Sequence, residues 1–222
     1  MNMDYWYRLF KIVTGIFQSI FISEVILLGK ENLPLGPKVY AGNHPNTANA
    51  MILPNLFPDR LHFLAYADTF KLPFFGWLLT LADQIRVAPG LGRTAINQAI
   101  DRLRLGNSLV ILPEGRMTLR GQGKLPGTSA VRLSLKTGAP VIPFSFYVPK
   151  EYIHSLKFRW FGKIKASRWQ LRGACYVVIG RPWYPSQFLR SRPTSKQIRQ
   201  LTYQLMNQID SLTQEAITYT QS

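Results

Sequence analysis

Residues 39–53 read VYAGNHPNTANAMIL, and this stretch joins two patterns of different period. Its first four residues form a short apolar run, which is typical of a buried strand. A helical pattern begins near Thr47, with Asn46 or Thr47 as the N-cap and with Pro45 restricting the residue before it to an extended conformation. A buried strand that leads directly into a helix is the repeating unit of an α/β fold.

The same alternation continues on both sides of this stretch. Strands are expected at 24–29, 39–42, 62–66, 108–112, 140–148 and 174–180, and helices at 47–56, 94–105, 129–137 and 195–212. Thr194 or Ser195 is the expected N-cap of the closing helix. Because strands alternate with helices, the sequence predicts an α/β fold with a single layered domain at residues 24–222, whose largely parallel sheet is flanked by helices.

The composition favours a globular protein with a polyanionic partner. Hydrophobic residues make up 46% of the 222, enough to bury a core, and 27 Lys and Arg against 11 Asp and Glu leave a formal charge of +16. Between residues 152 and 209 there is no acidic residue, and Trp160 and Trp169 lie among cations. That mixture suits a membrane interface or RNA, and a solvated basic face is the alternative. A single cysteine, Cys175, excludes an intramolecular disulfide and a Cys-based zinc site.

Residues 1–23 are expected to form an amphipathic membrane-associating helix ahead of the domain. Its apolar side comprises Trp6, Leu9, Phe10, Val13, Ile16, Phe17 and Ile20. The run is too short and too interrupted to span a bilayer, so we expect the helix to lie in one leaflet, the alternative being a helix packed on its own domain. The apolar stretch 72–81 joins it there or belongs to the core. Since no small-residue cleavage site follows, the cytoplasmic face of the membrane is the expected location.

The first candidate site is the loop between the strand and helix of residues 39–53. His44 lies next to the amino end of the helix, whose dipole disfavours the imidazolium and holds the ring neutral. A neutral histidine is what a general base requires. Asn49, one turn into the helix, is placed to accept a hydrogen bond from His44 Nδ1. From these residues alone, a structural histidine that caps the helix is the alternative.

The second candidate site follows the expected strand 108–112, in the stretch LPEGR at 112–116. Gly115 lets the backbone approach a ligand closely. Exposed turn amides beside cations such as Arg116 can hold a phosphate or a carboxylate, and Glu114 adds a carboxylate at the same place. A turn with one structural ion pair is the alternative.

Together the two sites resemble motifs of the glycerolipid acyltransferases of the lysophosphatidic acid acyltransferase (PlsC-like) family. The first motif of that family is a histidine, four residues and an aspartate, and here His44 is followed at that spacing by Asn49. The third motif is a Pro-Glu-Gly block, which LPEGR at 112–116 resembles. The fourth is a Val-Ile-Pro strand, which residues 138–143 resemble.

The second motif of the family is matched loosely by residues 83–87, so the phosphate-binding arginine that the resemblance implies is Arg86 or Arg93. The resemblance further implies that Glu114, Gly115 and Arg116 contribute to binding the phosphate of the substrate. It implies no metal and no bound cofactor.

The activity implied by the resemblance is acyl transfer from a thioester of acyl carrier protein or coenzyme A. The acceptor is the free hydroxyl of a lysophospholipid such as 1-acyl-glycerol-3-phosphate, and His44 is the general base. The implied partners are therefore membrane phospholipid, lysophospholipid and the acyl donor, and no nucleic acid. A lipid substrate also accounts for the amphipathic first helix and the basic surface.

One departure from the family pattern bears directly on catalysis. Asn49 stands where the family has aspartate, and an amide can accept a hydrogen bond but cannot balance an imidazolium charge. Three explanations follow: Asn49 suffices for a slow enzyme; a carboxylate from Glu114, Asp68 or Asp83 reaches His44; or the chain is a catalytically impaired, lipid-binding member of the family.

Overall fold

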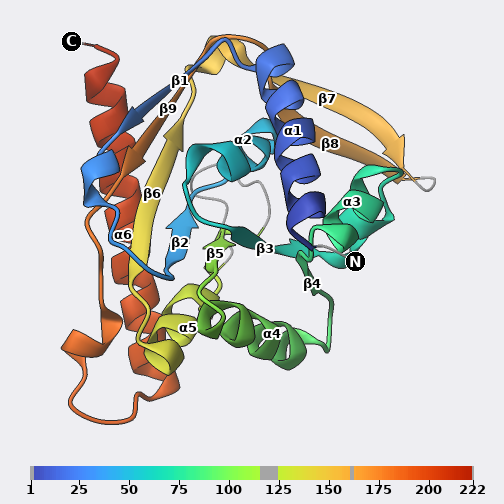
Figure 1. Cartoon of the computed structure of the whole chain (residues 1–222). Coiled ribbons are helices and arrows are strands. Elements are labelled where there is room, and N and C mark those ends of the chain that lie inside the picture. Colours follow the sequence, from blue (N-terminus) through green and yellow to red (C-terminus); the bar gives the residue numbers. More distant parts are fainter. Residues whose placement is uncertain (1–2, 116–124, 161–162, 222) are drawn as a thin grey trace.

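The structure, a computed structural model, describes residues 3–115, 125–160 and 163–221. A central sheet carries helices on both faces, and a two-stranded hairpin extends from one end (Figure 1). The strands of the sheet are β1 (Glu24–Leu28), β2 (Val39–Gly42), β3 (Leu61–Tyr66), β4 (Ile85–Val87), β5 (Ser108–Ile111), β6 (Val141–Tyr147) and β9 (Ala174–Ile179). The hairpin consists of β7 (Ile153–Trp160) and β8 (Lys163–Gln170). The α-helices are α1 (Met3–Phe21), α2 (Thr47–Leu56), α3 (Phe75–Leu81), α4 (Gly92–Arg104), α5 (Ser129–Thr137) and α6 (Ser195–Tyr219).

The sheet has the strand order β1-β9-β6-β2-β5-β3-β4. Neighbouring strands are parallel throughout, except that β6 and β9 are antiparallel. The expected α/β fold with a largely parallel sheet is therefore confirmed. Because β2, β5, β3 and β4 run in the same direction, their carboxyl ends meet at one edge of the sheet, which is where α/β proteins bind their ligands.

Strand β2 shows how one sequence run serves both faces of the sheet. Side chains alternate along a strand, so Val39 and Ala41 pack into the cluster formed with α4, α5 and α6, whereas Tyr40 packs into the cluster formed with α2. Gly42 ends the strand beneath the ring of Phe144, where a Cβ would lie 2.4 Å from Cζ. No larger residue fits at this position without displacing that ring.

The helix boundaries follow local capping chemistry. The side chain of Asn46 accepts a hydrogen bond from the backbone N–H of Asn49 at 3.2 Å, which fixes the start of α2. Thr194 and Gln197 form a capping box at the start of α6. Helix α6 continues well past its expected end at residue 212, because its later turns still pack along β6 and β9.

Among the described residues, one α-helix and three strands are not among those expected from the sequence: α3, β4, β7 and β8. Strand β4 has three residues and lies at the edge of the sheet, and α3 forms within the apolar stretch 72–81. The basic stretch after residue 152 forms the antiparallel hairpin β7–β8, with Ile153 paired to Gln170 at its base. Its many cations obscure the alternation of apolar residues that would indicate strands.

Helix α1 packs on the domain and also presents apolar side chains to solvent. Tyr7 and Phe10 are buried against α3, and Phe17 stacks on Phe21. Four apolar side chains on the opposite side are more than half exposed: Tyr5, Ile12, Ile16 and Ile20. Part of the expected apolar side thus packs on the domain, as one alternative predicted. The other part is exposed, as a helix that associates with a membrane requires. Within the described ranges, no helix has the length and apolar character needed to cross a membrane.

Candidate active site

The carboxyl ends of four adjacent strands bring the two candidate motifs together. His44 follows β2, the Glu114–Gly115 turn follows β5, Tyr66 ends β3, and Arg86 lies in β4. Neighbouring strands are spaced by about 4.8 Å, so the turn begins one strand away from His44 and β4 lies about 14 Å from β2. The carboxyl ends of these four strands therefore form a row, with His44 at one end and Arg86 at the other.

The loop that carries His44 is fixed by side chains on both sides. Asn43 donates to the carbonyl oxygen of Phe146 at 2.9 Å and accepts from its backbone N–H at 2.7 Å, which continues the pairing of β2 with β6. From β8, Arg168 donates through Nε to the carbonyl oxygen of Pro45 at 3.1 Å and through Nη2 to the same oxygen. The loop is therefore held in place before any substrate binds.

His44 is held neutral. Burial and, to a smaller extent, the nearby guanidinium of Arg168 together lower its pKa from 6.5 to about 4. The amino end of α2 acts in the same direction, because the helix dipole opposes a positive charge there. A neutral imidazole at physiological pH can accept a proton, as a general base must.

Asn49 lies in the first turn of α2 with its side chain fully buried. The hydrogen bond expected from His44 Nδ1 to Asn49 Oδ1 is not formed, and within the described residues both atoms are buried without a partner. Asp83, one of the three carboxylates considered as a substitute for the missing aspartate, instead accepts a hydrogen bond from Arg102 at 2.7 Å.

Nor does either other carboxylate considered as a substitute bind His44 Nδ1 in the described part of the chain. Asp68 pairs with Lys71 at 3.1 Å, and Glu114 belongs to the turn after β5. Among the described residues, none of the three carboxylates therefore takes the place of the missing aspartate at Nδ1.

Gly115 has the positive φ that its turn requires. Its φ is 68°, and a Cβ would lie 2.7 Å from Oη of Tyr66 on β3. The Gly115 N–H donates to the carbonyl oxygen of Leu112 at 2.9 Å. The turn is thus packed against the end of the neighbouring strand, as a close backbone approach requires. Arg116 lies outside the described residues.

The two candidate phosphate-binding arginines lie at the β4 end of the row. Arg86 is exposed, with its guanidinium carbon 4.7 Å from the ring centroid of Phe70. Arg93 is exposed in the first turn of α4, where the helix dipole is positive. Both side chains are free of ion pairs among the described residues, so either is accessible to an anion.

Residues 24–147 match the sequence profile of a family described as Acyltransferase. The chain belongs to the Acyltransferase family. The match begins at the first residue of β1 and ends at the last residue of β6, so it contains the whole row of strand ends described above.

Several relatives carry the same name. A 1-acyl-sn-glycerol-3-phosphate acyltransferase of Borreliella burgdorferi is 28% identical over 128 residues, which are 56% of this chain and 51% of that protein. One of Pseudomonas aeruginosa is 28% identical over 156 residues, 68% of this chain and 56% of that protein. One of Saccharomyces cerevisiae is 26% identical over 148 residues, 62% of this chain and 45% of that protein. The chain thus spans about half the length of the curated relatives it matches.

The fold is shared with a solved member of this group. The crystal structure of the 1-acyl-sn-glycerophosphate (LPA) acyltransferase PlsC from Thermotoga maritima superposes with a TM-score of 0.67, covering 98% of this chain and 81% of that one. Sequence identity across the superposition is 17%, so the match establishes the Acyltransferase fold and not the substrate.

Two residues contact the site in a way that the sequence does not predict. Arg168 contacts the His44 loop from β8, and Cys175 accepts a hydrogen bond from Asn49 Nδ2 at 3.3 Å from β9. Both are more than a hundred residues from the loop they contact, and no local pattern signals the contact. The sequence does indicate correctly that Cys175 is a buried residue inside a strand.

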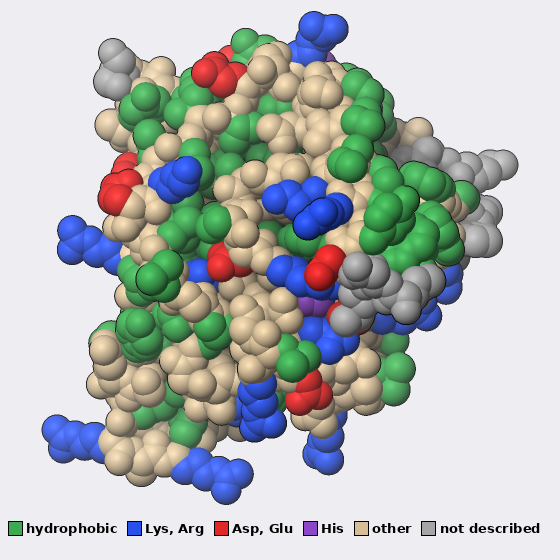
Figure 2. Space-filling view, in the orientation of Figure 1, with side chains coloured by type: hydrophobic (Ala, Val, Ile, Leu, Met, Phe, Trp, Pro, Cys, Tyr) green, Lys and Arg blue, Asp and Glu red, His purple; other side chains and the backbone are tan. Residues whose placement is uncertain are grey.

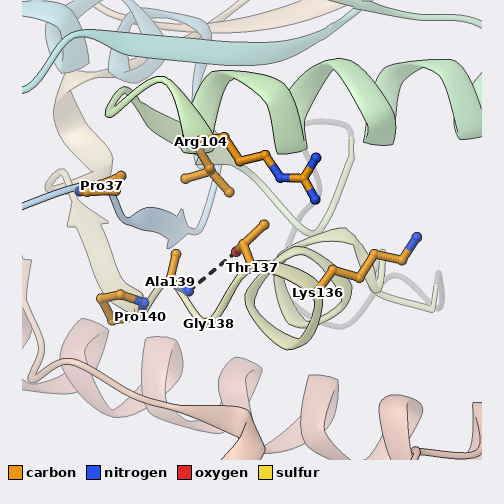
Figure 3. A pocket seen from close by; sticks show the side chains of 8 residues that line it. Pro37, Arg104, Lys136, Thr137, Gly138, Ala139 and Pro140 are labelled. Carbon is orange, nitrogen blue, oxygen red and sulfur yellow. Dashed lines mark hydrogen bonds between the residues drawn. The ribbon is translucent and has the colours of Figure 1, made fainter.

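A hollow of about 480 Å³ lies at the opposite edge of the sheet (Figure 3). Its lining consists of Pro37, Leu103, Arg104, Lys136, Thr137, Gly138, Ala139 and Pro140. Arg104 and Lys136 lie in the last turns of α4 and α5, where a cation stabilises the helix dipole. These charges have a structural explanation, and the hollow is separate from the His44 edge.

Proposed function

We propose that this chain transfers a fatty acyl group from an acyl thioester to the free hydroxyl of a lysophospholipid such as 1-acyl-glycerol-3-phosphate. His44 Nε2 removes the hydroxyl proton while the oxygen attacks the thioester carbonyl carbon. The tetrahedral intermediate then expels the thiolate, which takes the proton from the imidazolium and leaves as a thiol. Asn49 Oδ1 accepts the Nδ1 hydrogen and orients the ring.

The observation that carries this proposal is the position of a neutral His44 beside the Glu114–Gly115 turn. The pKa of about 4 keeps a lone pair on the imidazole, and the turn that contains Gly115 follows the neighbouring strand at the same edge of the sheet. Membership of the Acyltransferase family, and relatives named 1-acyl-sn-glycerol-3-phosphate acyltransferase, support the same reaction.

Substrate phosphate binds, in this proposal, toward the β4 end of the row. Arg86 and Arg93 are exposed there, and the turn that contains Gly115 lies between them and His44. Arg116 follows Gly115 in the sequence and is the further cation proposed to bind the phosphate. Glu114 is the carboxylate of that turn and is proposed to contribute to substrate binding. The acceptor hydroxyl then lies at the His44 end, with the phosphate anchored to one side.

The donor in this proposal is an acyl carrier protein or an acyl-coenzyme A. Both carriers are anionic, and a chain with a formal charge of +16 attracts them. Both are found in the cytoplasm, which supports a location on the cytoplasmic face of the membrane.

Helix α1 is the proposed membrane-associating element ahead of the domain at residues 24–222. Ile12, Ile16 and Ile20 recur every fourth residue and are exposed, so they form one apolar stripe. Trp6 contacts Trp77 of α3 edge to face at 5.3 Å, which extends the apolar surface onto α3. Hydrophobic side chains gather at the side of the molecule where α3 lies (Figure 2). Apolar side chains of this kind insert at the headgroup boundary of a bilayer.

A second candidate function rests on Asn49. Without a carboxylate beside His44, the chain acts instead as a catalytically impaired protein that binds membrane lipid. The two functions differ in acyl transfer. An enzyme transfers acyl groups and loses this activity in His44→Ala, whereas the lipid-binding protein shows no transfer. Liposome binding is unchanged by His44→Ala in both cases.

The deciding experiment measures acyl transfer to lysophosphatidate and to other lysophospholipids, from acyl carrier protein and coenzyme A thioesters. The variants are wild type, His44→Ala and Asn49→Asp. We expect transfer by wild type, none by His44→Ala, and an increase in Asn49→Asp. Transfer by Asn49→Asp alone supports the lipid-binding alternative. Transfer that survives His44→Ala contradicts the assignment of the base.

A further inference from the structure

The buried thiol of Cys175 is in contact with the candidate site. Its Sγ lies 3.3 Å from Nδ2 of Asn49, which donates the hydrogen bond, and both side chains are fully buried. Burial raises the pKa of the thiol to about 12, so it is uncharged at physiological pH. Cys175 lies in β9, and Asn49 lies in α2, which packs over that face of the sheet.

Two complementary atoms near this contact have no partner. Asn49 Oδ1 can only accept a hydrogen bond, and it is buried without a donor among the described residues. His44 Nδ1 is also buried without a partner in that part of the chain. The two side chains flank the amino end of the same helix, so a small movement of the His44 ring toward Asn49 would supply the donor that Oδ1 lacks when Nδ1 carries the imidazole hydrogen.

The orientation of the amide then determines the tautomer of His44. With Nδ2 on the thiol, Asn49 presents Oδ1, and His44 carries its hydrogen on Nδ1 with a lone pair on Nε2. With the amide reversed, Asn49 presents Nδ2–H, Nδ1 must accept, and the hydrogen moves to Nε2. The reversed arrangement cannot take a proton from a substrate hydroxyl, which is the defect produced by the same Asp-to-Asn exchange in serine proteases.

We propose that Cys175 is a positioning residue, which holds the Asn49 amide with Oδ1 toward His44 Nδ1 and so keeps His44 in the tautomer that proton abstraction requires. This inference rests on the proposed acyl transfer. A carboxylate has two equivalent acceptor oxygens and has no wrong orientation, so the family's aspartate needs no such partner. An amide at this position does need one, and the chain supplies a thiol.

The equivalence of carboxylate oxygens provides the test. Cys175→Ala is compared in two backgrounds, the natural chain and the Asn49→Asp variant. We expect a fall in kcat of about tenfold or more with KM within twofold in the natural chain, and less than a twofold change in the Asn49→Asp background. Equal losses in both backgrounds overturn the proposal, because they indicate a packing role. Val177→Ala, two residues along β9 in the same buried cluster, is the matched control for a cavity.

A second readout does not depend on activity. In protein labelled with ¹⁵N-histidine, the ring signals of His44 are identified by their loss in His44→Ala. We expect wild type to show hydrogen on Nδ1 and Cys175→Ala to show a substantial share of hydrogen on Nε2. Wild type with hydrogen on Nε2, or a Cys175→Ala spectrum identical to wild type, overturns the proposal. If no variant transfers acyl groups, the proposed function fails while this measurement still decides the role of Cys175.

Discussion

Arg168 in β8 donates a hydrogen bond from Nε to the carbonyl oxygen of Pro45, the residue that follows His44, at 3.1 Å. A strand far from the motif in sequence therefore anchors the loop that carries the base. The same guanidinium lowers the pKa of His44. One residue thus influences both the position of the imidazole and its charge.

Replacing this arginine is expected to disturb both properties. In Arg168→Met the loop loses its anchor from β8, and a small displacement of a catalytic group reduces kcat by about 10- to 100-fold. The pKa of His44 should rise at the same time, because a cation has been removed. The rate and the pH profile of kcat/KM measure the two effects. Lys157→Met is the matched control, since it removes an exposed cation from β7 of the same hairpin. An equal effect of both substitutions would indicate a general charge effect.

The acidic limb of the pH profile is expected well below the usual range of histidine. Because kcat/KM reports the free enzyme and the pKa of His44 is about 4, activity attributable to this residue should persist down to about pH 5. In Asn49→Asp the new carboxylate favours the imidazolium, and the limb should move up by about 1 to 3 pH units. A wild-type inflection near pH 6.5 would contradict the burial of this base.

Stability should depend on pH through the same residue. Below pH 6.5 the unfolded chain takes up a proton on His44 that the folded chain refuses until about pH 4. The contribution of His44 is therefore fully present above pH 6.5 and is lost as the pH falls, by up to about 3 kcal/mol. We expect the free energy of unfolding of His44→Gln to fall less than that of wild type between pH 7.5 and 4.5. Parallel curves would refute this, since His62 titrates in both proteins.

Gly42 is expected to tolerate no side chain. In Gly42→Ala the new Cβ meets the ring of Phe144 at 2.4 Å, and relieving that overlap should destabilise the fold by about 1 to 3 kcal/mol. Thermal unfolding measures the change. Gly92→Ala, at the start of α4 with no atom within 4 Å of the new Cβ, should leave stability unchanged or slightly raised.

The exposed stripe of α1 is expected to determine membrane affinity. Burying an isoleucine in an apolar environment contributes about 1.5 to 3 kcal/mol, so Ile12→Ser and Ile16→Ser should each weaken binding to anionic liposomes by about tenfold. Cosedimentation with liposomes measures the affinity. Leu105→Ser, which alters a still more exposed leucine at the end of α4, should leave it unchanged. If the two isoleucine variants bind like wild type, α1 is not the membrane-binding element.

The sequence by itself determined the α/β fold and the two motifs. Local rules suffice for these: the apolar run of β2, the cap of α2 at Asn46 and the turn at Gly115 each follow from residues within a few positions. The strand ends come together because parallel strands place their carboxyl ends at one edge. Those two facts place His44 and Glu114 near each other.

Tertiary structure alone decided what surrounds His44. Asn43 pairs with Phe146, Arg168 holds Pro45, and Cys175 contacts Asn49 across more than a hundred residues. Such contacts depend on which strands lie side by side and which face a helix covers, and neither is encoded in a local window. The pKa of the histidine has the same origin, because burial is a property of the packed core and not of the motif.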